Sequence, residues 1–170
     1  MINFKLIFKV LGQLMFLEAI MMLVCLGMAL FYGEDDVMAF LISIAIVMLF
    51  GLLLKYKGRS AGISMSRRDA YLLVTVTWVV FSLFGALPFV ISGYIPDYTD
   101  AYFETMSGFT TTGATIIDDV ECFPHGLIFW RSMTQWIGGL GIAFFTIAII
   151  PSLVGGSMRV FSAESVGPIK

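Results

Sequence analysis

A run of hydroxyl side chains broken by a single glycine is the part of this sequence best suited to chemistry. Residues 110–115 read Thr-Thr-Thr-Gly-Ala-Thr. β-Branched threonines disfavour a helix, and Gly113 permits backbone angles that other residues resist. A dehydrated monovalent cation needs several oxygen ligands in place of water, and an extended strand of carbonyls supplies them without a fixed charge. The segment therefore has the properties of a cation-binding strand, although a surface loop turning at Gly113 would share its composition.

Acidic residues flank this segment on both sides, and neither flank carries a Lys or Arg before Arg131. As single residues they fit solvated loop charges. Together they would also raise the local concentration of cations at the mouth of a pore. They are Asp97, Asp100, Glu104, Asp118, Asp119 and Glu121.

The composition indicates an integral membrane protein. Of 170 residues, 59% are hydrophobic and 13% are charged, whereas soluble domains have about 25% charged residues. A helix needs about 20 apolar residues to cross the hydrocarbon of a bilayer. Four stretches are long enough, and we expect spans over residues 10–32, 37–54, 70–92 and 125–150.

The charges between these spans predict their orientation. Lys5 and Lys9 precede the first span, the loop at 33–36 is acidic, and the loop at 55–69 carries five Lys or Arg residues. Cytoplasmic loops collect Lys and Arg. We therefore expect a multi-pass membrane protein of the inner-membrane type with a cytoplasmic N-terminus, residues 33–36 outside and residues 55–69 inside.

Residues 101–117 could be taken for a further span on a hydropathy plot, but the acidic flanks place both ends of this stretch on the outer face. A crossing would also place the basic residues of the C-terminal stretch outside, against the positive-inside bias. Non-helical backbone at membrane depth is tolerated only where protein or a water-filled cavity surrounds it. We expect a re-entrant segment that lines a cavity, with a short helix over 99–109 capped by Thr99 or Asp100.

The strings GFTTTGATII, FWRSMTQWIGGLGI and FSAESVGP occur in this order. They resemble the first pore repeat of the Trk/Ktr/HKT superfamily of potassium transporters, most closely its TrkH-type members. The resemblance covers essentially the whole sequence. It implies an all-α integral membrane protein in which two leading transmembrane helices precede one potassium-channel-like repeat of helix, re-entrant pore helix with filter, and helix.

The resemblance also divides the sequence into parts. Members of the family carry four such repeats, so this sequence is expected to be the N-terminal quarter of a pore, in preference to one of four assembling copies. The expected parts are residues 1–69 (two leading helices and a basic cytoplasmic loop), 70–151 (first pore repeat: helix 70–92, pore helix 99–109, filter 110–115, helix 125–150) and 152–170 (cytoplasmic start of a linker to the second repeat).

Potassium uptake is the function that the resemblance implies, with potassium as the transported ion and no organic cofactor. Thr111, Thr112 and Gly113 are the expected carbonyl donors to potassium, with Thr110 and Ala114 beside them. In the family, glycine at the position of Gly113 accompanies potassium permeability. Implied partners are membrane lipid, a second copy in a homodimer and a cytosolic nucleotide-binding regulatory subunit of the TrkA type, and no nucleic acid.

Two charged residues lie within predicted spans. Arg131 is either an interfacial anchor or the partner of Asp118, Asp119 or Glu104 in an ion pair that braces the filter loop. Glu18 is either an ion-path residue or, as we expect from its place in a leading span, a neutral or hydrogen-bonded structural residue.

Two other functions compete with a pore. An intramembrane hydrolase is not expected, because the sequence has no GxSxG, P-loop or HExxH motif and only one histidine, His125; we predict that the protein is not an enzyme. A non-conducting four-span accessory or assembly subunit would share the spans but gives no reason for the threonine-rich strand between acidic loops.

Overall fold

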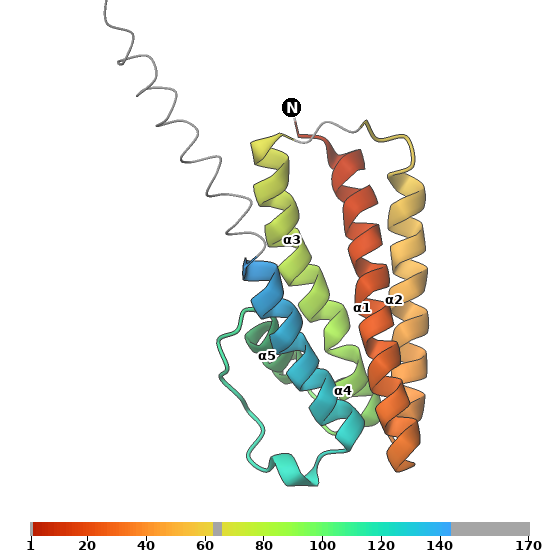
Figure 1. Ribbon diagram of the computed structural model, residues 1–170, viewed down its shortest axis with the longest axis vertical. Helices are drawn as coiled ribbons and strands as arrows, with labels where there is room; N and C mark the ends of the chain where they lie inside the picture. The colour runs from red at the N-terminus through yellow and green to blue at the C-terminus, as the bar shows by residue number, and fades with distance from the viewer. Residues whose placement is uncertain (1, 63–65, 144–170) are drawn as a thin grey trace, which may run out of the picture.

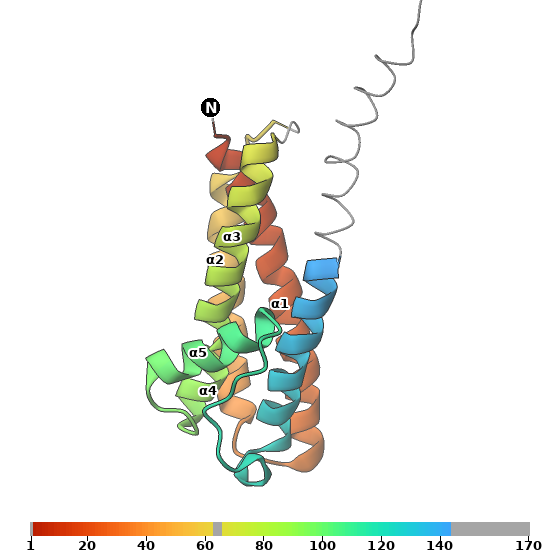
Figure 2. The ribbon, with the colours of Figure 1, turned by 90° about the vertical axis from the view of Figure 1, so that its left-hand side faces the viewer.

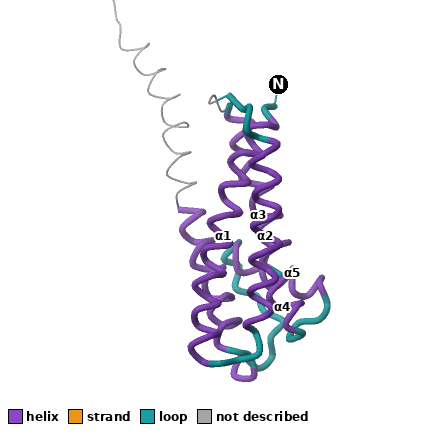
Figure 3. Tube along the Cα trace, turned by 90° about the vertical axis from the view of Figure 1, so that its right-hand side faces the viewer, coloured by secondary structure: helices purple, strands orange, loops and turns teal. Residues whose placement is uncertain are grey.

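The computed structural model describes residues 2–62 and 66–143, and every regular element within them is helical (Figure 3). This confirms the predicted all-α class. The elements are α1 (Phe4–Tyr32), α2 (Val37–Lys57), α3 (Arg67–Gly85), α4 (Leu87–Ser92), α5 (Tyr98–Phe109), a 3-10 turn at Val120–Cys122 and a last helix that begins at residue 125 and is described as far as residue 143.

Three segments of the described chain are long and apolar enough to cross a membrane. They are α1, α2 and the stretch Arg68–Ser92, which consists of α3 from its second residue onward and α4. The fourth expected span, 125–150, is described only to residue 143. Residues 144–150 and the expected linker at 152–170 lie outside the described residues.

Helices α1 and α2 form an antiparallel hairpin whose backbones approach closely at a glycine. A Cβ atom at Gly12 would lie 2.8 Å from both the carbonyl oxygen of Gly51 and the amide nitrogen of Lys55. Small residues allow membrane helices to pack at short range. At the other end of α1, Gly33 adopts a left-handed conformation (φ 69°) that ends the helix and opens the acidic turn.

Helix α3 begins earlier than hydropathy alone predicts, at Arg67 instead of residue 70. Ser66 and Asp69 form a capping box, in which each side chain accepts a hydrogen bond from the other residue's backbone N–H. Asp69 also accepts from the backbone N–H of Asn3 at 2.9 Å. The starts of α1 and α3 therefore lie together at one end of the bundle.

The expected single helix over 70–92 is two helices, because the chain breaks at Ala86. Pro88 lies at the start of α4 and has no N–H to continue the hydrogen bonding of α3. Three side chains from later segments bond to carbonyl oxygens near the end of α3. Tyr98 donates to Leu83 (2.7 Å), Thr105 to Ser82 (2.9 Å) and Trp130 to Gly85 (2.9 Å).

The segment between α4 and the last helix starts and finishes at the same end of the bundle. His125 donates its backbone N–H to Glu34 Oε2 at 2.6 Å, so the last helix starts beside the α1–α2 turn, opposite the end where α3 begins. Figures 1 and 2 show α5 and the loop after it in the half of the molecule that contains this turn. Residues 93–124 thus form an excursion and no further crossing.

We predict that Gly12→Ala destabilises the protein, because the added methyl would force the backbones of α1 and α2 apart. The expected loss is about 1–3 kcal/mol of unfolding free energy, measured by thermal unfolding of the full-length protein in detergent. Gly27→Ala is the matched control, because Gly27 lies on the same helix with nothing within 4 Å of its added Cβ. An equal loss in both variants would contradict the close contact.

Candidate functional site

Helix α5 is the element that positions the threonine-rich segment, and its first turn is fixed by Asp97. The Asp97 carboxylate accepts hydrogen bonds from the N–H groups of Thr99 (2.7 Å) and Asp100 (3.2 Å). These bonds, led by that from Asp100, hold the pKa of Asp97 below its ordinary value. The expected caps, Thr99 and Asp100, were wrong by two to three residues, because the acceptor lies one turn before the donors.

The far end of α5 is anchored by Phe109, which is fully buried. Its ring centroid lies 5.5 Å from that of Phe81, 6.3 Å from that of Trp130 and 6.4 Å from that of Trp78. Aromatic pairs at such separations add to the free energy of apolar burial. The residue before the threonine run is therefore held between α3 and the last helix.

The chain leaves the helical path directly after Phe109. Thr111 donates its N–H to the Gly108 carbonyl (2.9 Å) and Thr112 donates to the Ser107 carbonyl (3.0 Å). Thr111 has φ 58° and Gly113 has φ 78°, whereas no positive φ occurs at Thr112. A β-branched residue with positive φ is a strained exception that the surrounding structure must hold in place.

This alternation of φ affects where the carbonyl groups of the segment can point. In an ordinary strand successive carbonyls face opposite sides, and left-handed residues at alternate positions rotate the peptide planes so that carbonyls can share one side. None of the carbonyl oxygens at 110–113 accepts a hydrogen bond from the described residues. The Ala114 carbonyl differs, because it accepts from Ser107 Oγ at 2.6 Å.

Residues 110–116 are also exposed on the surface of the described chain. After α5 the loop turns and runs toward the end of the bundle that contains the α1–α2 turn (Figure 2). Unpaired backbone oxygens at membrane depth are costly unless a ligand, water or other protein surrounds them. The geometry suits a strand that offers up to four carbonyl oxygens, at Thr110, Thr111, Thr112 and Gly113, to a ligand outside the described residues.

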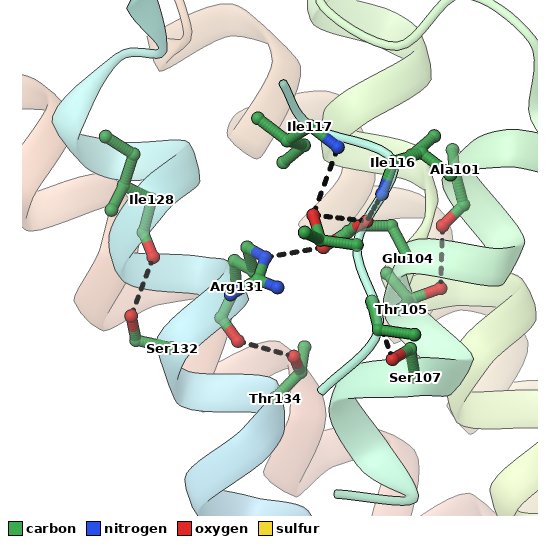
Figure 4. Close-up of polar contacts among 12 residues, drawn as sticks. Ala101, Glu104, Thr105, Ser107, Ile116, Ile117, Ile128, Arg131, Ser132 and Thr134 are labelled. Carbon is green, nitrogen blue, oxygen red and sulfur yellow. Dashed lines mark hydrogen bonds and ion pairs between the residues drawn. The ribbon is translucent and has the colours of Figure 1, made fainter. Parts of the chain in front are cut away.

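Glu104 fixes the return of the strand, through the polar contacts drawn in Figure 4. Its side chain is 1% exposed. It accepts hydrogen bonds from Thr115 Oγ1 (3.0 Å) and from the backbone N–H of Ile116 (3.0 Å). Arg131 Nε on the last helix pairs with the same carboxylate at 2.5 Å. One buried side chain thus connects α5, the return strand and the last helix.

Of the partners considered for Arg131, the structure selects Glu104 and neither of the two aspartates. Asp118 is exposed. Asp119 accepts from the N–H of Glu121 at 3.0 Å and caps the turn Val120–Cys122. Arg131 is therefore a bracing residue in geometry, and the two aspartates belong to the acidic surface of the loop.

The last helix packs closely against the end of α5 at two glycines, Gly138 of the last helix and Gly108 of α5. The sequence analysis did not assign either glycine to the site. A Cβ at Gly138 would overlap the carbonyl group of Phe109, and a Cβ at Gly108 would overlap the Thr134 hydroxyl. Gly139, the next residue along, has only Thr111 Cγ2 nearby, at 3.9 Å from an added Cβ. Gly138 and Gly139 are adjacent in the sequence, and the structure shows that Gly138 is the one that contacts Phe109.

A second contact that the sequence did not reveal joins the acidic turn to the start of the last helix. His125 Nδ1 lies 2.7 Å from Glu34 Oε1, and the imidazole stacks on Tyr32 with ring centroids 3.9 Å apart. Burial opposes ionisation of Glu34, but the hydrogen bonds from His125 outweigh it and lower the Glu34 pKa. Among the described residues no group of three or more His, Cys, Asp or Glu side chains could hold a metal ion.

We predict that Glu104→Gln lowers the unfolding free energy by about 3 kcal/mol, because it leaves the Arg131 guanidinium without its partner charge. Asp100→Asn is the control, because Asp100 is an exposed carboxylate on the same helix and its loss should cost about 0.5 kcal/mol or less. Chemical denaturation of the two full-length variants measures the difference. Similar midpoints would show that the Glu104 carboxylate does not brace the strand.

We also predict that Gly138→Ala displaces the end of α5, with an expected cost of about 1–3 kcal/mol for overpacking. Gly139→Ala, one residue away, should unfold like the unsubstituted protein. The thermal unfolding temperatures of both variants provide the measurement, and a larger effect at Gly139 would contradict the contact with Phe109.

Comparison with known proteins places this geometry in a family. The family model for TrkH, described as a cation transport protein, matches residues 36–170. The TrkH potassium uptake protein of the Trk system from Escherichia coli K12 is 36% identical over 170 residues, which cover 99% of this chain and 35% of the relative. Its counterpart from Halomonas elongata is 33% identical over 169 residues, again 99% of this chain and 35% of the relative.

A solved structure agrees with the sequence matches. The crystal structure of the potassium transporter TrkH from Vibrio parahaemolyticus superposes with a TM-score of 0.82 at 33% identity, covering 88% of this chain and 32% of that one. The chain thus spans about a third of the length of these relatives. Because the family model matches well over half of the sequence, the chain belongs to the TrkH family of cation transport proteins.

Proposed function

We propose that the protein takes up potassium across the bacterial inner membrane, and that this chain supplies one of four filter strands of the pore. The observation that carries the proposal is the backbone of residues 110–113, where left-handed Thr111 and Gly113 alternate with Thr112 and none of the carbonyl oxygens accepts a hydrogen bond from the described residues. The names of the relatives, potassium uptake proteins, support the choice of ion.

In this proposal the carbonyl oxygens of Thr111, Thr112 and Gly113 replace part of the water shell of a potassium ion. Thr110 lies at the inner end of the strand, where its hydroxyl bonds to the Met106 carbonyl at 2.7 Å. Ala114 flanks the donors and takes no ion, because its carbonyl is held by Ser107. A ring of ligands needs further strands, consistent with a chain that spans 35% of its relatives.

Glu104 and Arg131 brace the strand without adding net charge beside the ion. The buried carboxylate holds Thr115 and Ile116 on the return path, and the guanidinium neutralises it. Such a rigid support matters because carbonyl ligands select between cations only while their positions are maintained. The exposed acids around the loop, Asp118 and Asp119 among them, raise the cation concentration at the outer mouth.

The proposal also includes the orientation of the protein in the membrane and its partners. The N-terminus is cytoplasmic and the α1–α2 turn is external, as the Lys and Arg distribution predicts. Lipid surrounds the apolar faces of the helices. A homodimer and a cytosolic nucleotide-binding regulatory subunit of the TrkA type belong to the proposal through the family alone.

Replacing the glycine of the strand tests this function. We predict that Gly113→Ser in the full-length protein lowers the selectivity for potassium over sodium about tenfold, which corresponds to about 1.4 kcal/mol, because a side chain disfavours the left-handed backbone at φ 78°. Rubidium and sodium fluxes into proteoliposomes provide the measurement.

Gly93→Ser is the matched control for backbone strain. Gly93 is also left-handed, at φ 81°, with nothing within 4 Å of an added Cβ, but it lies at the end of α4 and outside the strand. We expect this control to keep the selectivity of the unsubstituted protein. Equal selectivity in Gly113→Ser would remove the filter assignment, and absence of any flux in the unsubstituted protein would favour a non-conducting accessory subunit.

A further inference from the structure

A carboxylate in the middle of the first membrane helix is not used by the proposed pore. Glu18 lies on α1 and is 0% exposed. Neither of its carboxylate oxygens has a hydrogen-bond partner among the described residues. An isolated ionised carboxylate in an apolar interior is among the most costly groups that a protein can bury.

The position of Glu18 connects the leading hairpin to the pore repeat. A Cβ added at Gly85, the last residue of α3, would lie 3.4 Å from Glu18 Oε1 and 3.0 Å from the ring of Phe109. The Gly85 carbonyl is already bonded by Trp130. The Glu18 carboxyl group therefore lies at the break between α3 and α4, close to the residue that anchors the candidate filter strand.

No described charge forms a hydrogen bond with Glu18. Lys55, in the last turn of α2, places its ammonium 5.5 Å from the centroid of the Phe16 ring instead. Residues 37–54 of α2 and 70–92 of α3 and α4 contain no Asp, Glu, Lys, Arg or His, and their one titratable side chain is Tyr71. On the last helix, Arg131 is paired with Glu104 and His125 with Glu34.

The remaining titratable groups on the neighbouring helices do not supply a counter-charge either. Lys9 lies nine residues before Glu18 on α1, about 14 Å along the axis, and Cys25 is a buried thiol two turns after it. Helix α5 contributes only acids and phenols, namely Tyr98, Asp100, Tyr102 and Glu104.

The part of the protein beyond this chain cannot reach Glu18 without rearrangement, because residues of this chain already enclose it completely. The compensating species must therefore be small. An alkali cation needs several oxygen ligands, whereas a proton needs only one oxygen and removes the charge altogether.

We propose that Glu18 is a proton-binding site and that the protein holds it as a neutral carboxylic acid. A hydronium ion transfers one proton to the carboxylate: one O–H bond of hydronium breaks, one O–H bond forms on the carboxyl group, and a water molecule is left. Loss of this proton would place an uncompensated charge between α1, the α3–α4 break and Phe109. The packing of the leading hairpin against the pore repeat is therefore linked to pH, independently of which ion the pore conducts.

Infrared spectroscopy of the full-length protein in lipid tests this site. The carbonyl-stretch band of a protonated carboxylic acid should be present at neutral pH in the unsubstituted protein and absent in Glu18→Gln, which mimics the neutral acid in shape. Glu121→Gln, an exposed carboxylate, is the control and should leave the band unchanged. A spectrum in which Glu18→Gln removes an ionised carboxylate band would overturn the proposal.

Thermal unfolding against pH gives a second readout. In the unfolded chain Glu18 is an ordinary carboxyl group that ionises at about pH 4.3, whereas the folded protein keeps it protonated. The unfolding temperature of the unsubstituted protein should therefore fall, relative to that of Glu18→Gln, as pH rises above about 4.3 and through neutral. Identical pH profiles would overturn the proposal. If Glu18→Gln did not fold because its two N–H donors lack partners, Glu18→Met, which also removes the ionisable group, replaces it in both measurements with the same expected and contradicting results.

Discussion

A buried carboxylate that connects three separate segments holds the candidate site together. Glu104 on α5 accepts from Thr115 and Ile116 on the return strand and pairs with Arg131 on the last helix. Without it, the strand after α5 would have only local bonds, to Met106, Ser107 and Gly108 and between Thr110 and Thr112, to maintain a positive φ at a threonine. A strained backbone persists only where its surroundings over-determine it.

Further hydrogen bonds hold α5 itself in place. Tyr98, Thr105 and Trp130 donate hydrogen bonds to carbonyl oxygens near the end of α3, beside the break at Ala86. These bonds attach α5 and the last helix to the end of α3. Phe109 fills the space between them. Hydrogen bonds from side chains to backbone thus hold α5 within the bundle. Backbone polar groups at membrane depth require such partners.

Much of this architecture could be predicted from sequence, because it follows from local signals. Hydropathy located the spans, and acidic flanks with a threonine-glycine run indicated an excursion after a short helix. The break at Ala86 has a local signal in Pro88, which hydropathy does not detect. The pair of Glu34 with His125 joins residues 91 positions apart and has no local pattern. The choice of Glu104 over the aspartates as partner of Arg131 also required the fold.

The central claim is that backbone oxygens of Thr111, Thr112 and Gly113 bind the transported ion. The most direct test is a crystal structure of the full-length protein grown with rubidium, whose anomalous scattering marks its position. The account predicts an anomalous peak on the pore axis within coordination distance of these carbonyls. Rubidium sites confined to the acidic loops, with none beside this strand, would contradict it.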